Sequence, residues 1–366
     1  MQVPFVDLKK QYLSIKEEID GAIESVINET AFIKGKYVSK FEQEYKEAYD
    51  VKNVISCANG TDAIYIALKS LGIGHGDEVI TVSNTWISTA ETISQVGAKP
   101  VFVDINPDLY TIDHKLIEKK ITKKTKAIIP VHLYGQSCNM HFIQELCKNY
   151  NLYLIEDCAQ AHFAEWKGKK VGTFGNVATF SFFPGKNLGA YGDAGAIITN
   201  DDSLANSMRM FANHGALKKH EHNIEGINSR LDGIQAAILS IKLPHIHSWS
   251  SLRLQNALYY NELLSDIDEL KIPSISSSAK HVFHLYVVRA NQRDELQKYL
   301  SDSKIFTSIH YPTPLPFLKA YEYLKHSPDD FPVSFDYMDK ILSLPMFPEL
   351  SKSQIEYVAM KIKDFY

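Results

Sequence analysis

Lys186 lies in the run SFFPGKNLG, where small and apolar residues surround the amine and follow an expected β-strand. Such crowding removes water from an ammonium group, which lowers its pKa and leaves a neutral amine able to form an imine with a carbonyl group. Most lysines are solvated surface charges instead. The run therefore indicates a reactive lysine without excluding a surface one.

Two acids, Glu156 and Asp157, follow the apolar run LYLI and open the segment EDCAQAH. A carboxylate at the end of a buried strand is costly unless a cation pairs with it. That cation could be the protonated pyridine nitrogen of a bound cofactor, or it could be a structural arginine or lysine. The segment alone leaves both alternatives open.

Gly60 and Thr61, in the segment ANGTD, follow another expected strand and open an expected helix. A glycine lets the backbone approach a ligand closely, and the free amides of a first helical turn, together with the Thr61 hydroxyl, suit a phosphate group. A helix N-cap without any ligand is the alternative.

Trp86, just after the run EVITV, could lie flat on an aromatic ring or fill the core, and its position favours stacking.

The elements that must position these residues alternate between β-rich runs and helical patterns. Two amphipathic helical stretches, 11–28 and 36–49, come first; the apolar runs NVISCA, EVITV, KPVFVDI, AIIPVHLYG and LYLIEDCAQ then alternate with helical segments. Apolar strands separated by helices predict a mainly parallel sheet covered on both faces, and thus an α/β fold. Ligands of such sheets gather where strands end and helices begin, which is where the candidate segments lie.

The pattern changes from Gly172 onward, where the glycine-punctuated strands TFGNVATFSFF and GDAGAIIT precede a long helical run. That run begins near Arg230 and is interrupted at Pro244, so we place a domain boundary there. The expected domains are a large α/β domain, residues 1–245, and a small α+β domain, residues 246–366. The small domain should contain the strands HVFHLYVVRA and IFTSIHY, a helix around RDELQKYL and a closing helix from Lys352.

Composition and charge narrow the classes of function. The 366 residues carry a formal net charge of -4, which gives no field that would gather nucleic acid or an anionic membrane. The four cysteines are too scattered for a disulfide framework, and no C-x-x-C pair suggests zinc or redox chemistry. The histidines of KKHEHN and PHIH have no spacing that gathers a closed set of ligands, so we expect no metal. The N-terminus has acidic residues and no apolar signal region, which predicts a cytoplasmic protein.

Together the four segments offer the groups that pyridoxal 5'-phosphate (PLP) requires of a protein: a phosphate site, an acid for the ring nitrogen, an aromatic side chain against the ring and a lysine for the imine. The sequence resembles, over nearly its whole length, the nucleotide-sugar aminotransferases of the DegT/DnrJ/EryC1/StrS family. The resemblance is carried by the motifs ANGTDA, GDEVITVSNTW, EDCAQAH, FSFFPGKNLGAYGDAGA and NSRLDGIQAA. It implies PLP-dependent transferase fold type I, the architecture of aspartate aminotransferase.

The resemblance also implies roles for individual residues around the cofactor. Lys186 would hold PLP as an imine, and Asp157 would lie at the pyridine nitrogen. The remaining cofactor contacts would be Gln160 near the phenolic oxygen, Gly60, Thr61 and Ser181 around the phosphate, and Trp86 against the ring.

Three further positions concern the substrate and the partner subunit. Asn228 would reach the cofactor phosphate of the neighbouring subunit, which implies a homodimer with shared active sites. His162 and Arg230 would lie on the substrate side. Relatives often have Gly-Ala after this histidine, whereas this chain has Phe163 and Ala164, so a bulky ring beside the cofactor is expected to reshape the substrate pocket.

The implied reaction is transamination of a nucleotide-linked ketosugar with glutamate as the amino donor. The SFFPGKNLGAYGDAG and NSRLD stretches look more like members that convert a dTDP-3-keto-6-deoxyhexose into a dTDP-3-amino-3,6-dideoxyhexose. Amination at C4 of a UDP- or dTDP-4-keto-6-deoxyhexose is the alternative.

Three other classes of protein fit the sequence less well. Related dehydratases have a histidine where this chain has Lys186. A non-catalytic regulator of the same fold is expected to lose Lys186 or Asp157, and both are present. A dinucleotide-binding dehydrogenase is disfavoured because the glycines of GIGHG lack the G-x-G-x-x-G spacing and precede a strand.

Overall fold

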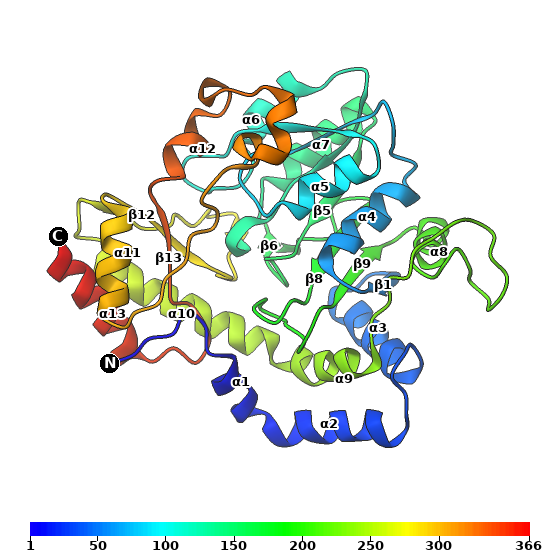
Figure 1. The fold of residues 1–366 in the computed structure, drawn as a ribbon, viewed down its shortest axis with the longest axis horizontal. Coiled ribbons are helices and arrows are strands. Elements are labelled where there is room, and N and C mark those ends of the chain that lie inside the picture. Colours follow the sequence, from blue (N-terminus) through cyan, green and yellow to red (C-terminus); the bar gives the residue numbers. More distant parts are fainter.

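A seven-stranded sheet forms the centre of the molecule in a computed structural model that describes residues 1–366 (Figure 1). Its strand order is β1-β9-β8-β5-β4-β2-β3. Only β9 runs antiparallel to its neighbours, β1 and β8, which confirms the predicted mainly parallel α/β sheet. The strands are β1 (Asn53–Cys57), β2 (Glu78–Val82), β3 (Lys99–Val103), β4 (Thr125–Ile129), β5 (Tyr153–Asp157), β8 (Val177–Ser181) and β9 (Gly195–Thr199).

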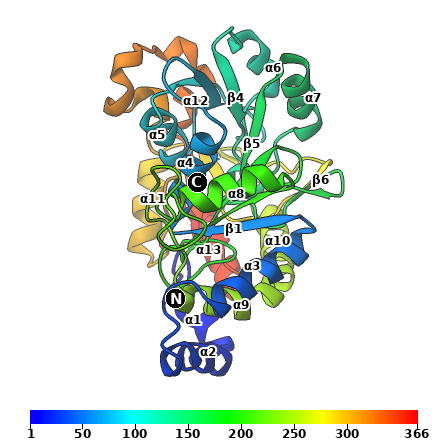
Figure 2. The same ribbon diagram turned by 90° about the vertical axis from the view of Figure 1, so that its right-hand side faces the viewer.

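Helices bury both faces of this sheet, which is why its strands read as continuous apolar runs. Alternate strand residues enter separate clusters, so Ile155 packs with α4, α5 and α8, whereas Leu154 packs with α7 on the other face. Figure 2 shows α8 on one side of β1 and α3 on the other. The helices of this part are α1 (Leu8–Ser14), α2 (Lys16–Asn28), α3 (Lys36–Tyr49), α4 (Gly60–Ser70), α5 (Ser88–Gln95), α6 (His114–Ile117), α7 (Met140–Tyr150), α8 (Asp202–Phe211) and α9 (Gly233–Lys242).

The long helical run is divided where the sequence predicts, because Pro244 lies in a 3-10 turn between α9 and α10 (Ile246–Leu264). A proline has no amide hydrogen to continue the helical bonding. The division of the chain into domains at this point stays a prediction. The predicted first helix, 11–28, begins three residues earlier and is divided at Ile15 into α1 and α2.

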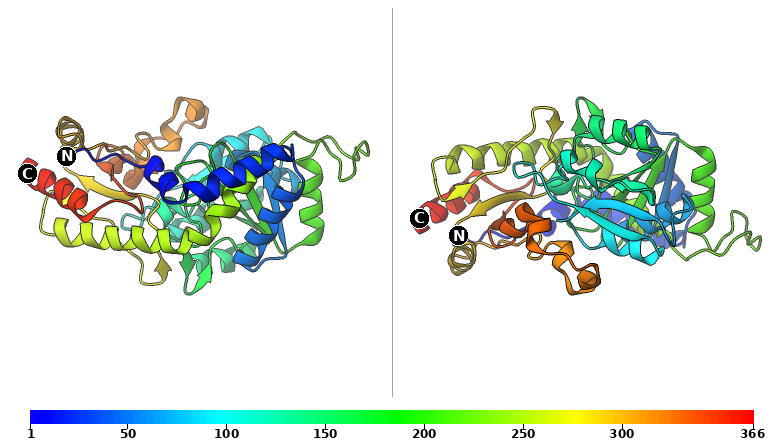
Figure 3. Two further views of the ribbon diagram at one scale, coloured as in Figure 1. Left: turned by 90° about the horizontal axis from the view of Figure 1, so that it is seen from below. Right: turned by 90° about the horizontal axis from the view of Figure 1, so that it is seen from above.

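A second, antiparallel sheet has the order β10-β12-β13 and packs against α10, α11 and α13. Both chain ends lie in this region (Figure 3), where Val3 pairs with Ile305. A third small sheet, β11-β6-β7, joins the segment after β5 to the C-terminal part. The elements are β6 (Glu165–Trp166), β7 (Lys169–Lys170), β10 (Leu270–Lys271), β11 (Ala279–Lys280), β12 (Tyr286–Ala290), β13 (Ile341–Leu344), α11 (Arg293–Asp302), α12 (Pro332–Tyr337) and α13 (Lys352–Phe365).

The prediction that residues 305–311, IFTSIHY, form a strand is wrong. These residues form only isolated bridges, from Ile305 to Val3 and from Ser308 to Ser343. Because these two bridges face different segments, no continuous ladder forms, and the chain turns toward the end of β5, where Tyr311 contacts Gln160. Helix α13 begins at Lys352, as predicted. Across the whole chain, no helix combines the length and the apolar character needed to traverse a bilayer.

Candidate active site

Asp157 is the last residue of β5 and is buried, with 4% of its surface exposed. Side chains alternate along a strand, so Asp157 faces α5 while Glu156 faces the opposite side of the sheet. Its carboxylate accepts hydrogen bonds from Thr89 Oγ1 at 2.8 Å and from the amide of Ala159 at 3.1 Å, and it forms no ion pair. Burial raises the pKa of Asp157. A buried carboxylate without a cation is a suitable partner for a protonated ring nitrogen.

Lys186 lies in a tight turn after β8, defined here as the Lys186 turn, residues 183–189. The Lys186 amide donates to the carbonyl of Phe183 at 2.8 Å, and a Cβ on Gly189 would come within 2.3 Å of the Pro184 carbonyl oxygen. Burial lowers the pKa of the Lys186 amine to about 8, against an opposing effect from the charge of Asp157. The turn therefore holds a partly desolvated amine near the buried acid, as the sequence predicts.

The start of α4 and the end of β8 meet in a group of small polar residues. Asn59 caps α4 by accepting from the amide of Asp62 at 2.8 Å, and the first amides of the helix have no intrahelical acceptor. A Cβ on Gly60 would come within 2.7 Å of Ser181 Cβ, so only glycine allows this approach. Thr61 Oγ1 lies 2.6 Å from the Ser88 hydroxyl. Amides and hydroxyls gathered at a helix N-terminus form a donor set that fits a phosphate.

Gln160 and Trp86 both contact Tyr311. Gln160 Oε1 accepts from the amide of Tyr134 at 2.6 Å, and its Nε2 donates to the Tyr311 hydroxyl at 3.0 Å. The ring of Trp86 packs 5.7 Å from that of Tyr311 and is 58% exposed. Core filling is therefore excluded as the role of Trp86, and its ring is free to contact a ligand.

His162 is not on the substrate side, because its ring is fully buried and both nitrogens are bonded within the protein. Its Nε2 lies 2.9 Å from the carbonyl oxygen of Ser181, which can only accept, so this nitrogen carries the hydrogen. Its Nδ1 then accepts from the Tyr45 hydroxyl at 3.0 Å. Burial lowers the pKa of His162 to about 4, which keeps the ring neutral. The histidine therefore holds the backbone of Ser181 from the face of the sheet that α3 covers.

Phe163 does not lie beside the cofactor site, contrary to the expectation from the sequence. Its ring is 1% exposed and packs 4.5 Å from the ring of Tyr49, within the core between α3 and the sheet. Its backbone has a φ of +60°, a region that glycine enters without steric cost. The left-handed turn directs the side chain into the core, so this departure from relatives does not reshape the pocket.

Asn228 and Arg230 both belong to the segment between α8 and α9. Asn228 is exposed and forms an isolated bridge with Asn213 just after α8, and the next residue, Ser229, bonds to the Ala58 amide and to Asp62 at the start of α4. Arg230 lines a separate cavity of about 230 Å³, the Arg230 pocket, whose other charged residues are Lys34, Glu42 and Arg209. None of the residues that line this pocket belongs to the Asp157 and Lys186 site.

Sequence reasoning missed several residues that the fold brings to this site. Thr89 bonds to Asp157, and its position on the helix after Trp86 was a usable signal. Tyr311 and His284 lack such a signal, because they come from segments more than a hundred residues after β5, whereas Asn187 directly follows Lys186 in the run SFFPGKNLG.

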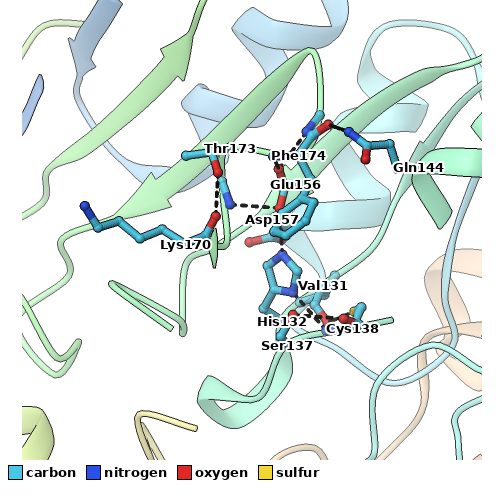
Figure 4. A network of polar contacts seen from close by, with 12 residues as sticks. Val131, His132, Ser137, Cys138, Gln144, Glu156, Asp157, Lys170, Thr173 and Phe174 are labelled. Atoms are coloured by element: carbon cyan, nitrogen blue, oxygen red, sulfur yellow. Dashed lines mark hydrogen bonds and ion pairs between the residues drawn. The ribbon is translucent and has the colours of Figure 1, made fainter. Parts of the chain in front are cut away.

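Glu156 forms a buried network on the opposite face of the sheet (Figure 4). Its carboxylate accepts from three backbone amides, those of Gly172, Phe174 and Gly175, at 2.7 to 2.8 Å. It also lies 3.2 Å from Nε2 of His132, whose Nδ1 accepts from the amide of Cys138. These hydrogen bonds already use both ring nitrogens and the carboxylate, so the nearby Cys158 does not make this group a built metal site. The network fixes the strand end that carries Asp157.

Replacing Glu156 with glutamine should destabilise the fold. Each carboxylate oxygen faces two donors, so the amide NH₂ must face N–H groups in either orientation. We expect Glu156→Gln to lower the free energy of unfolding by about 3 kcal/mol in urea titrations. Glu165→Gln is the matched control: Glu165 pairs with Lys280 near the surface and should change stability by less than about 0.5 kcal/mol. Equal effects in the two variants would contradict the structural role of Glu156.

Comparison with known proteins reveals close relatives over the full chain. A model of the DegT/DnrJ/EryC1/StrS aminotransferase family matches residues 13–363. A pleiotropic regulatory protein of Geobacillus stearothermophilus is 47% identical, covering 100% of this chain and 99% of that protein. The dTDP-3-amino-3,6-dideoxy-alpha-D-galactopyranose transaminase of Aneurinibacillus thermoaerophilus is 43% identical, with 99% of each covered. The crystal structure of S. venezuelae DesV matches with a TM-score of 0.97 at 39% identity, covering 100% of this chain and 98% of that one.

These matches confirm fold type I, PLP as the cofactor and sugar-nucleotide transamination as the class of reaction. The site fits that cofactor, since it combines an unpaired buried carboxylate, an amine of lowered pKa and a helix N-terminus with small hydroxyl residues. The chain belongs to the DegT/DnrJ/EryC1/StrS aminotransferase family.

Proposed function

We propose that Lys186 and Asp157 are the catalytic pair of this aminotransferase. The observation that carries the proposal is that a buried carboxylate without an ion-pair partner lies near an amine whose pKa is lowered to about 8. Lys186 would hold PLP covalently, by condensing its amine with the aldehyde and releasing water. When bound, PLP supplies an electron-withdrawing ring that stabilises negative charge at the carbon bearing the amino group.

The two residues divide the proton chemistry between them. Asp157, fixed by Thr89 and the Ala159 amide, would hold a proton on the ring nitrogen through a charge-assisted hydrogen bond. Lys186, once released as a free amine, would take a proton from the substrate carbon and return it. An amine with a pKa near the working pH serves as both base and acid.

The other predicted residues would bind and orient the cofactor. Gly60, Thr61 and Ser181 would contact its phosphate, since they meet at the start of α4. Gln160 would lie near the phenolic oxygen, and Trp86 would cover the ring, which its exposure permits.

The proposed substrate is a dTDP-3-keto-6-deoxyhexose, aminated at C3 with glutamate as donor to give a dTDP-3-amino-3,6-dideoxyhexose. The names of two relatives support C3: the 43% identical protein is a dTDP-3-amino-3,6-dideoxygalactose transaminase, and a 40% identical one is a UDP-N-acetyl-3-dehydroglucosamine 3-aminotransferase. A GDP-perosamine synthase is less similar, at 36% identity. C4 amination of a UDP- or dTDP-4-keto-6-deoxyhexose is the alternative.

NMR of the product tests the position of amination. The enzyme would be incubated with glutamate and, in parallel, with dTDP-3-keto, dTDP-4-keto and UDP-4-keto sugars. We expect the carbon-bound amine at C3 and turnover of the dTDP-linked 3-ketosugar in preference to the others. A product aminated at C4 would replace the substrate assignment and leave the Lys186 and Asp157 roles intact.

We further propose a cytoplasmic homodimer in which each active site uses residues of both subunits. Asn228 is exposed, and Arg230 lines a pocket that does not include Lys186, so both residues are open to a second subunit. A second subunit would bring Asn228 to the cofactor phosphate and Arg230 to the substrate side.

Mixing two inactive variants tests the shared site. Lys186→Ala lacks the amine, and Asn228→Asp should lose most activity because its carboxylate repels a phosphate. Random exchange of subunits should restore about a quarter of wild-type activity, since half the dimers are hybrids with one intact site. Asn223→Asp, on the same exposed segment, is the matched control and should remain active alone. A hybrid dimer without recovered activity would contradict shared sites.

A non-catalytic regulator is the second candidate, because the 47% identical relative carries a regulatory name. Lys186 and Asp157 favour the enzyme, since a regulator needs neither a neutral amine nor a ring acid. A protein that binds PLP but turns over none of the ketosugars would favour the regulator.

A further inference from the structure

The side chain next to Lys186 ties its turn to a distant segment of the chain. Asn187 is 3% exposed, and its Nδ2 donates to the carbonyl oxygen of Val282 at 3.0 Å. A carbonyl oxygen only accepts, so this bond fixes the orientation of the amide and directs Oδ1 away from it. Oδ1 lies 3.2 Å from Nδ1 of His284. The Lys186 turn is therefore attached at both amide atoms to residues 282–284, just before β12.

The hydrogen on the His284 ring must lie on Nδ1. The amide oxygen of Asn187 has no hydrogen to offer, so the ring nitrogen is the donor. Burial lowers the pKa of His284 well below its usual value, and the positive charges of Lys186 and Arg253 act in the same direction. The ring therefore stays neutral and keeps one donor directed at Asn187.

His284 is itself held in place from two sides. Arg253, buried on α10, donates through Nη1 to the carbonyl oxygens of Phe283 and His284 at 3.2 and 3.3 Å. On the other side, Gly135 has a φ of +98°, and a Cβ there would come within 2.9 Å of the backbone nitrogen of His284. Only a glycine allows the turn after β4 to pack this closely. The backbone of His284 thus has little freedom to move away from Asn187.

We propose that His284 is a positioning residue that fixes the Lys186 amine by holding the side chain of Asn187. The inference rests on the proposed function of Lys186 and adds a residue from the C-terminal part of the chain to the amino-transfer machinery. Without the Nδ1 hydrogen bond, the side chain of Asn187 is held only through Val282, while Lys242 still bonds to the far end of the turn at Gly189. The turn then loosens, water reaches the amine, and the lysine leaves the orientation that its proton transfers require.

Spectral titration of the PLP-loaded enzyme tests this positioning role. The visible absorption of bound PLP changes with pH as the Lys186 nitrogen gains or loses its proton. Greater access of water favours the protonated, charged form. We therefore expect His284→Leu to raise the midpoint of this titration by about one pH unit, a tenfold change in the equilibrium. Its kcat should fall about tenfold, with KM within about twofold of wild type.

Three further variants separate positioning from general damage. His284→Asn places an amide N–H near the position of Nδ1 and should restore the wild-type midpoint. His284→Gln places its amide near the position of Nε2 and should behave like His284→Leu, which keeps the test open if the leucine variant does not fold. His281→Leu is the matched control, because His281 is buried in the same segment, stacks on Phe283 at 3.8 Å and bonds only to the Phe283 amide.

The outcomes distinguish this inference from the proposed function. An unchanged midpoint in both His284→Leu and His284→Gln, or an equal shift in His281→Leu, would overturn the role of His284. If borohydride reduction of the wild-type enzyme does not attach PLP covalently to Lys186, the proposed function of Lys186 is refuted, whatever the His284 variants show.

Discussion

Lys186→Ala should abolish amino transfer, lowering kcat by at least about 10⁴-fold, because no other amine can both hold PLP and move the proton at the substrate carbon. The variant should retain PLP only through non-covalent contacts, so the cofactor should wash out on gel filtration. Steady-state assays and the absorbance of the filtered protein measure the two effects.

A second buried lysine of the wild-type protein is an internal control for the assignment of Lys186 as the residue that holds PLP. Lys242 is a second buried lysine whose pKa is also lowered to about 8, but its amine donates to the Gly189 carbonyl at 2.7 Å and lies over the ring of Tyr191. Borohydride reduction followed by peptide mass mapping should place the phosphopyridoxyl group on Lys186 and leave Lys242 unmodified. A modified peptide containing Lys242 would show that a low pKa alone, and not position near Asp157, selects the lysine.

Asp157→Asn should bind PLP yet lower kcat by about 10³-fold, since a neutral amide cannot keep the ring nitrogen protonated. The fold should tolerate the change. The asparagine oxygen can accept from the Ala159 amide, and its NH₂ can donate to the Thr89 hydroxyl. Kinetics with saturating PLP, together with the absorbance of bound cofactor, measure the effect.

Asp104→Asn provides the matched comparison. Asp104 is also 4% exposed, but its carboxylate accepts from the amides of Ile105, Val333 and Ser334, outside the site. This variant should lose stability and keep its kcat, whereas Asp157→Asn should do the reverse. Wild-type turnover in Asp157→Asn would refute its role at the ring nitrogen.

The central chemistry was predictable from the sequence because it depends on where strands end. Parallel strands place their carboxyl ends along one edge of the sheet, so acids after LYLI and a lysine after a later strand were expected at that edge, and the pairing of β5 with β8 makes them neighbours. The family resemblance implied that Gly60 and Ser181 surround one phosphate, and in the structure a Cβ added to Gly60 would come within 2.7 Å of Ser181 Cβ. These residues are fixed by their own strands and need no information about distant segments.

The rest of the site depends on side-chain direction and long-range packing, which local patterns do not encode. His162 follows Asp157 closely in the sequence but points into the core, since the chain turns between them. The side chain of Phe163 also points into the core, because its positive φ turns the backbone at that residue. Tyr311 and His284 reach the site only through the way the C-terminal part packs against the turn after β4.

The hydrogen bonds of Asn187 have a consequence for engineering sugar preference by exchanging parts between relatives. Lys186 and Asn187 lie before Pro244, but the groups that hold Asn187, at Val282 and His284, lie after it. A chimaera joined at Pro244 would pair a lysine from one parent with supports from another. The two parent proteins must therefore match at Asn187, Val282 and His284. Otherwise the chimaera combines a new pocket shape with a misplaced lysine.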